Sequence, residues 1–103
     1  MAPDTVACPC NIFQLGIQFT MFPIIEFNRS AFKHGITEAN IRYAMWHPLC
    51  EQLLEAYVNK WMIIGYDTAG NLIEVTYNII DDDTVNVFHA MPCRNKFLSQ
   101  LNL

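Results

Sequence analysis

The feature that most constrains the fold is a pair of apolar segments joined by a turn in the second half of the chain. Val58 to Tyr66 is rich in large apolar residues, and Leu72 to Ile80 alternates apolar with polar residues. Asp67 to Asn71 lies between them and contains Gly70, which can adopt a positive φ. Alternation with a period of two is typical of β-strands, so the sequence predicts an antiparallel hairpin. One face is expected to be buried and the other partly wet, with Ile73, Val75, Tyr77 and Ile79 on the first and Glu74, Thr76 and Asn78 on the second.

A third strand, Thr84 to Ala90, is expected after an acidic turn, and Pro92 ends it because proline cannot donate to the ladder. Arg94 to Leu101 then predicts a short C-terminal helix. Strict alternation puts Val85, Val87 and His89 on one face of the strand and Asn86, Phe88 and Ala90 on the other. By this parity, His89 is either a hydrogen-bonded histidine at the edge of the core or a catalytic one, and the sequence leaves both open.

The first half of the chain predicts a short strand and two helices. Ile24 to Phe27 is the strand, and Asn28 to His34 is a helix that Asn28 can cap. Thr37 caps a second helix, which must stop before Pro48. Leu49 to Ala56 suits a helix or a strand edge equally.

Together these elements predict one α+β domain. We expect an antiparallel β-meander sheet with two N-terminal helices and a short C-terminal helix, in residues 21 to 103. Residues 1 to 20 are treated as an N-terminal extension to which the sequence assigns no role. The apolar stretch from 12 to 25 is interrupted by polar residues and Pro23, so neither a signal peptide nor a membrane span is expected, and no membrane is expected as a partner.

Charge and cysteine content narrow the classes of function. Ten acidic and six basic residues give a net charge of −4, so nucleic-acid binding would depend on a local basic patch. Four cysteines lie at positions 8, 10, 50 and 93. Cys8 and Cys10 are too close together for a CxxC metal site, and no second pair lies at metal-ligand spacing. Scattered thiols fit a reducing cytoplasm, where Cys50 and Cys93 would be small packing residues. We expect no metal and no cofactor.

The candidate catalytic residues cluster at the end of the last strand. His89, Arg94 and Lys96 lie within eight residues, and Lys33 and His34 could close the other side of a cleft. Histidine can act as a general base or acid because its pKa lies near neutrality, and arginine suits a phosphate group through its planar fork of donors. Lys33 and His34 are also explained by a helix C-terminus, whose dipole favours cations. Arg94 and Lys96 at a helix start are not explained in this way.

The order of these motifs resembles the BrnT family, small bacterial ribonuclease toxins with a RelE-like fold. The segments that carry the resemblance are Ile25-Glu26-Phe27-Asn28, Lys33-His34-Gly35-Ile36, Ala44-Met45-Trp46-His47-Pro48, Ile63-Ile64-Gly65-Tyr66-Asp67 and Val85-Asn86-Val87-Phe88-His89-Ala90. Family members commonly end the last strand in Ser-Ala-Arg with further basic residues. This chain has Met91-Pro92-Cys93-Arg94 instead, which moves the arginine and thins the positive charge.

The resemblance implies the toxin component of a type II toxin-antitoxin system, a cytoplasmic, metal-independent endoribonuclease that cleaves mRNA. Its catalytic residues would be His89, Arg94, Lys96 and His34, with RNA bound by Lys33, Arg94 and Lys96. Its partners would be RNA and a cognate antitoxin, for which a ribbon-helix-helix protein is one candidate, in a homodimer or a hetero-tetramer with the antitoxin. The alternative is a non-catalytic protein-interaction module on the same scaffold, which the acidic charge favours.

Overall fold

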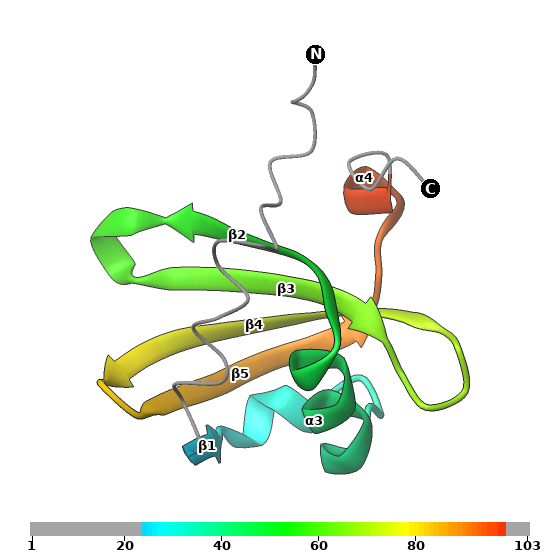
Figure 1. The fold of residues 1–103 in the computed structure, drawn as a ribbon, viewed down its shortest axis with the longest axis horizontal. Helices are drawn as coiled ribbons and strands as arrows, with labels where there is room; N and C mark the ends of the chain where they lie inside the picture. The colour runs from blue at the N-terminus through cyan, green and yellow to red at the C-terminus, as the bar shows by residue number, and fades with distance from the viewer. Residues whose placement is uncertain (1–23, 99–103) are drawn as a thin grey trace.

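The computed structural model describes residues 24–98 as one curved sheet with short helices around it (Figure 1). The strands are β1 (Ile24–Phe27), β2 (Pro48–Glu55), β3 (Lys60–Tyr66), β4 (Leu72–Asp81) and β5 (Thr84–Pro92). The helices are the 3-10 helices η1 (Arg29–Phe32) and η2 (Ala56–Val58) and the α-helices α3 (Glu38–Trp46) and α4 (Asn95–Leu98). The predicted α+β class is confirmed, while the proposed extension and the end of the predicted C-terminal helix lie outside the described residues.

The five strands form a mixed sheet in the order β1-β5-β4-β3-β2. β2 to β5 make the predicted antiparallel meander, but β1 lies parallel to β5, with Ile25 opposite Val85. The predicted antiparallel meander is therefore confirmed, and β1 makes the whole sheet mixed by adding a parallel strand at its edge. β1 and β5 are neighbours in the sheet but are joined through β2, β3 and β4 and not by a tight turn. This long connection allows the two strands to run in the same direction.

The two predicted N-terminal helices differ in kind. Thr37 caps α3 as predicted, accepting a hydrogen bond from the amide of Asn40, and α3 ends at Trp46, before Pro48. The segment after Asn28 forms only the single turn η1, capped by the Asn28 side chain at 3.4 Å from the amide of Ser30. A short 3-10 turn suits this place because it only has to carry the chain around the sheet edge.

The ambiguous segment between α3 and β3 is a strand. β2 pairs with β3 along most of its length, with Cys50 opposite Ile64 and Leu53 opposite Trp61, and its ladder shifts register twice. Hydrogen bonding to β3 and packing of alternate residues outweigh the helix propensity of the leucine and glutamate residues.

The β3–β4 turn forms as predicted. The Asp67 carboxylate accepts hydrogen bonds from the amides of Ala69 and Asn71 at 2.9 and 2.8 Å, and Gly70 has a φ of +85°. Such side-chain to backbone bonds fix a turn locally, so the register of the hairpin is set close to the turn itself.

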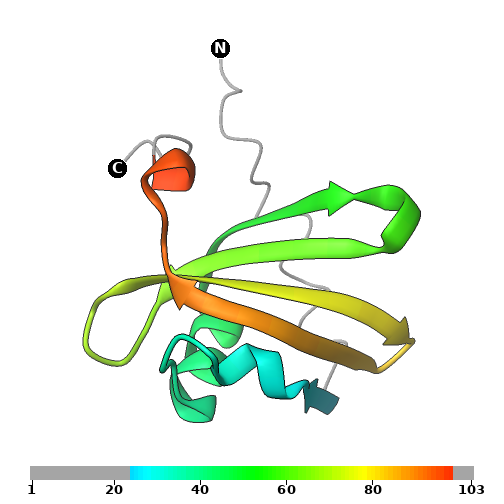
Figure 2. The same cartoon turned by 180° about the vertical axis from the view of Figure 1, so that it is seen from behind.

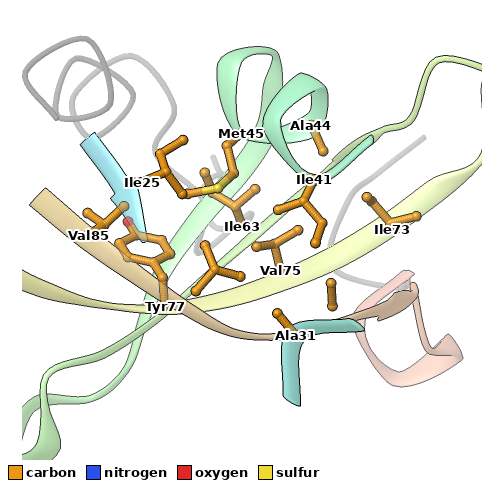
Figure 3. Close-up of a cluster of buried hydrophobic side chains, with 12 residues drawn as sticks. Ile25, Ala31, Ile41, Ala44, Met45, Ile63, Ile73, Val75, Tyr77 and Val85 are labelled. Atoms are coloured by element: carbon orange, nitrogen blue, oxygen red, sulfur yellow. The ribbon is translucent and has the colours of Figure 1, made fainter. Parts of the chain in front are cut away.

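The main core lies between α3 and one face of the sheet (Figure 3). Ile41, Ala44 and Met45 of α3 recur at a spacing of three to four residues and are buried against that face. The sheet contributes fully buried residues from three strands, namely Ile63, Ile73, Val75, Tyr77, Val85, Val87 and Ala90. Close approach of α3 to β3 is possible because Gly65 has no side chain, since a Cβ there would lie 2.8 Å from the Ala44 carbonyl oxygen.

The opposite face of the sheet carries a smaller cluster under α4. Cys50, Met62 and Ile64 pack there with Phe97. Cys50 is buried as predicted but is disulfide-bonded, so its prediction as a free thiol is wrong. Figure 2 shows the chain leaving β5 and rising to α4, with η1 running alongside β5.

This second face is less wet than alternation predicted. Glu74 is 0% exposed and Thr76 3% exposed, although both alternate with the core residues of β4. The prediction of a partly wet face is therefore wrong at these two positions. A buried carboxylate requires charged or hydrogen-bonding partners, which other segments of the chain supply.

A β-bulge in β5 reverses the predicted parity of its last residues. Thr76 pairs with His89 and Tyr77 pairs with Val87, so Phe88 is the extra residue on the bulged strand. Ala90 consequently joins the main core, and His89 lies on the opposite face with Glu74. The predicted grouping of His89 with Val85 and Val87 is wrong for this reason.

No helix within residues 24–98 has the length and apolar character needed to cross a membrane.

Candidate functional site

A pocket of about 370 Å³ lies on the face of the sheet opposite α3. Its lining comes from η1, all four meander strands and the segment before α4, and consists of Ser30, Lys33, Leu54, Lys60, Thr76, Phe88, His89 and Arg94. The charged residues of this lining are all cations or a histidine. The acidic chain therefore carries a local basic hollow, of the kind that holds an anion.

Glu74 lies behind the pocket and holds two of its lining residues. Its carboxylate accepts hydrogen bonds from Arg94 at the backbone amide (3.1 Å), at Nε (3.1 Å to each oxygen) and at Nη2 (2.6 Å). Nε2 of His89 lies 3.2 Å from the same carboxylate. Burial alone would raise the pKa of Glu74, but the hydrogen bonds from Arg94 and His89 outweigh it and lower that pKa.

His89 is held neutral by its surroundings. Burial lowers its pKa, and the attraction of the Glu74 carboxylate offsets only part of that effect. A neutral imidazole can accept a proton near pH 7. The ring of His34 lies edge-on to it, with 5.6 Å between the ring centroids, so two of the predicted catalytic residues are neighbours.

η1 follows the end of β1 and lies over β5. This position brings Lys33 to the pocket. The amide of Asn28 makes the last strand-like bond, to the carbonyl of Val87 at 2.8 Å, and the chain then turns into η1. The Ser30 hydroxyl donates to the carbonyl of the bulged Phe88 at 2.6 Å. That bond joins η1 to the bulge, so Lys33 and His89 reach the same hollow from segments far apart in the sequence.

The predicted site residues divide into two groups. His89, Arg94 and Lys33 line the pocket, and His34 contacts the ring of His89. Lys96 does not line it; its ammonium lies 5.0 Å from the centre of the Phe97 ring on α4.

Cys93, also a predicted packing residue, directly precedes Arg94 in the chain. It packs against the apolar residues under α4. Burial and the Glu74 charge raise the pKa of its thiol to about 11, so it stays protonated and is a poor nucleophile.

Sequence reasoning missed Glu74 and Lys60. Alternation places Glu74 on the wet face, and its partner Arg94 comes 20 residues later. A glutamate inside an apolar strand was the one available signal, because such a residue needs a cationic partner if it is buried. Lys60 at the start of β3 carries no local signal at all.

Within the described residues, no group of three or more His, Cys, Asp or Glu side chains could hold a metal ion.

Comparison with solved structures finds the Brucella abortus ribonuclease toxin BrnT, at a TM-score of 0.51 and 16% sequence identity. The match covers 69% of this chain and 96% of that chain. This chain has a BrnT-like fold. The resemblance predicted from weak sequence motifs is confirmed at the level of the fold. No family model and no curated protein matches the sequence.

Proposed function

We propose that this chain is a BrnT-like toxin that cleaves RNA, with the basic pocket as its active site. The observation that carries the proposal is the placing of a neutral histidine beside an arginine and two lysines in one hollow. A phosphodiester with its neighbouring hydroxyl group needs this combination of a proton acceptor and cations. The BrnT-like fold supports it, because the matched Brucella protein is a ribonuclease toxin.

The chemistry is a transesterification that needs no metal. His89 takes the proton of the 2′-hydroxyl, whose oxygen attacks phosphorus while the bond to the 5′-oxygen breaks. Arg94 stabilises the charge that develops on the phosphate, because its planar donors match phosphate oxygens. His34, at 5.6 Å from the His89 ring, supplies the proton that the leaving 5′-oxygen requires.

The lysines extend the anion-binding surface. Lys33 and Lys60 line the pocket and bind the phosphate backbone on either side of the reacting group. Lys96, outside the lining, binds a flanking phosphate of the same strand. We infer mRNA as the substrate class, because a single strand can present its backbone to so small a hollow.

We infer a cognate antitoxin as the protein partner, which would neutralise the toxin by covering the pocket. Two assemblies are to be tested: a hetero-tetramer with a ribbon-helix-helix antitoxin, and a homodimer of the toxin. We infer a cytoplasmic location, because mRNA would be the substrate. The disulfide at Cys50 is the one observation that argues against a reducing compartment.

A second candidate is a non-catalytic interaction module. It is favoured by the apolar end of the β2–β3 hairpin, where Leu53, Tyr57 and Val58 are 46, 102 and 54% exposed. Apolar groups gathered at an exposed edge are typical of a surface that binds a protein.

Inducible expression in a bacterial host separates the two candidates. The toxin should arrest growth, and His89→Ala should relieve the arrest. His47→Ala is the matched control, because His47 is exposed at the end of α3 and lies outside the pocket lining. No arrest by the wild-type chain favours the interaction module, and arrest by the His89→Ala variant contradicts the assignment of the active site.

A further inference from the structure

We propose that Glu74 is a positioning residue that fixes His89 as its Nε2–H tautomer, so that Nδ1 is the proton-accepting atom, and that it holds Arg94 by one edge of the guanidinium. The inference rests on the proposed function for its role in catalysis. Its structural content, the tautomer of one histidine and the anchoring of one arginine, can be tested without RNA.

The first argument is the position of Glu74. It is 0% exposed and does not belong to the pocket lining, so the carboxylate cannot touch a substrate in the pocket. It acts only through Arg94 and His89, which do line the pocket. That arrangement is typical of the supporting groups behind an active site, which lock the side chains that do the chemistry.

The second argument is the direction of each hydrogen bond. An ionised carboxylate only accepts hydrogen bonds, and the lowered pKa of Glu74 keeps it ionised at neutral pH. Nε2 of His89, 3.2 Å away, must therefore carry the hydrogen. A neutral imidazole has one N–H, so Nδ1 has the free lone pair.

The third argument is the way Arg94 is held. Its Nε and Nη2 donate to Glu74, and the backbone amide of the same residue donates as well. Among residues 24–98, Nη1 has no hydrogen-bond acceptor, and the Arg94 side chain is 44% exposed. One edge of the guanidinium is thus anchored, and its remaining donors are left for an anion.

A single buried carboxylate consequently positions both the proton acceptor and the phosphate-binding cation. Loss of its charge should disturb both at once, even though it touches neither substrate nor reacting atoms. Misplacement by about 1 Å of groups set up in this way can cost on the order of 100-fold in rate.

The test uses the full chain labelled with ¹⁵N in histidine. Two-bond ¹H–¹⁵N correlation spectra at neutral pH should show His89 with a protonated Nε2 and an unprotonated Nδ1. A pH titration of Glu74→Gln should give a lower His89 pKa than the wild type, because the attraction of the carboxylate is removed. Glu26→Gln removes the same charge from an exposed position on β1 and should leave the His89 titration unchanged.

Activity provides the second readout. Glu74→Gln should lower kcat/KM for an RNA oligonucleotide by about 10- to 100-fold, with Glu26→Gln at the wild-type value. A purely structural role for Glu74 would reduce stability but leave the tautomer and titration of His89 as they are. An Nδ1–H tautomer in the wild-type protein, or identical His89 titrations in Glu74→Gln and the wild type, would overturn the inference.

The wild-type spectrum stands on its own if Glu74→Gln does not fold, and Glu74→Asp then serves as the variant that keeps the charge while shortening the side chain. The expected tautomer in a chain that cleaves no RNA would support the inference and contradict the proposed function. The two proposals therefore fail separately.

Discussion

The hydroxyl of Tyr77 donates a hydrogen bond to the carboxylate of Glu51 inside the main core. Glu51 is 0% exposed, and its second oxygen, Oε1, has no hydrogen-bond partner within the described residues. Burial raises the pKa of Glu51 to about 7, while the bond from Tyr77 opposes that rise. The core therefore contains an acid that prefers its neutral form.

This acid should make the protein less stable as the pH rises. The folded-state pKa, about 7, lies above the ordinary value of 4.5, so the folded chain binds the proton more tightly than the unfolded chain. The stabilisation is complete below pH 4.5 and is lost as the pH rises to about 7. The loss amounts to about 3 kcal/mol.

Glu51→Gln isolates that effect from other titrating groups. The free energy of unfolding, measured by urea denaturation from pH 4 to 8, should show the variant gaining on the wild type by about 2–3 kcal/mol across the range. Glu55→Gln, exposed at the end of β2, is the matched control and should run parallel to the wild type. Parallel curves for Glu51→Gln would contradict the account of the core.

Gly65→Ala should push α3 away from the sheet. The new Cβ would lie 2.8 Å from the carbonyl oxygen of Ala44 and 3.2 Å from that of His47, and neither backbone group can yield easily. We expect a loss of about 2 kcal/mol in thermal or urea unfolding, typical of overpacking. Gly70→Asn is the comparison, because a side chain there meets nothing within 4 Å and adds only the backbone strain of the φ of +85°, which asparagine bears better than most residues. Wild-type stability of Gly65→Ala would show that α3 is not tightly packed.

Arg94→Ala should destabilise the fold through the carboxylate that it leaves behind. Glu74 would remain buried with one of its two partners removed. The expected cost is about 2 kcal/mol, below that of a fully buried pair because the Arg94 side chain is 44% exposed.

A double variant identifies the source of that cost. Adding Glu74→Gln to Arg94→Ala should recover much of the lost stability, since the uncompensated charge is removed. Arg42→Ala, which breaks an exposed pair with Glu38 on α3 and removes the guanidinium that lies 5.2 Å from the centre of the Phe27 ring, should cost at most about 1 kcal/mol. Simple additivity of the Arg94 and Glu74 substitutions would refute the coupling.

The activity should have an acid limb that belongs to His89. Burial lowers the pKa of this histidine, so the ring is neutral at pH 7 and becomes protonated only below the ordinary value of 6.5. A proton acceptor that is itself protonated cannot act as a base, so kcat/KM for RNA should fall as the pH drops below 6.5. A midpoint above 6.5, or the same limb in His89→Ala, would assign the base to another group.

Local signals in the sequence were enough for much of the scaffold. Asp67 and Gly70 specify the turn between β3 and β4 through contacts within a few residues, and Thr37 caps α3 in the same way. Such features depend on neighbours in sequence and can therefore be predicted from it.

The site was less predictable because it depends on distant partners. The burial of Glu74 is decided by Arg94, and the face on which His89 lies is decided by the bulge at Phe88. A bulge shifts every later residue of the strand by one, so alternation alone gave the wrong face. The clustering of His89 and Arg94 was visible in the sequence, but the contribution of Lys60 needed the fold.

Cleavage of a single-stranded RNA oligonucleotide in the presence of EDTA tests the central claim most directly. The wild-type chain should cut it and leave a 2′,3′-cyclic phosphate, the product of attack by the 2′-oxygen. His89→Ala should be slower by about 10²- to 10⁴-fold, with His47→Ala at the wild-type rate. Uncut RNA with the wild-type chain, or equal cutting by the wild type and His89→Ala, would contradict the account.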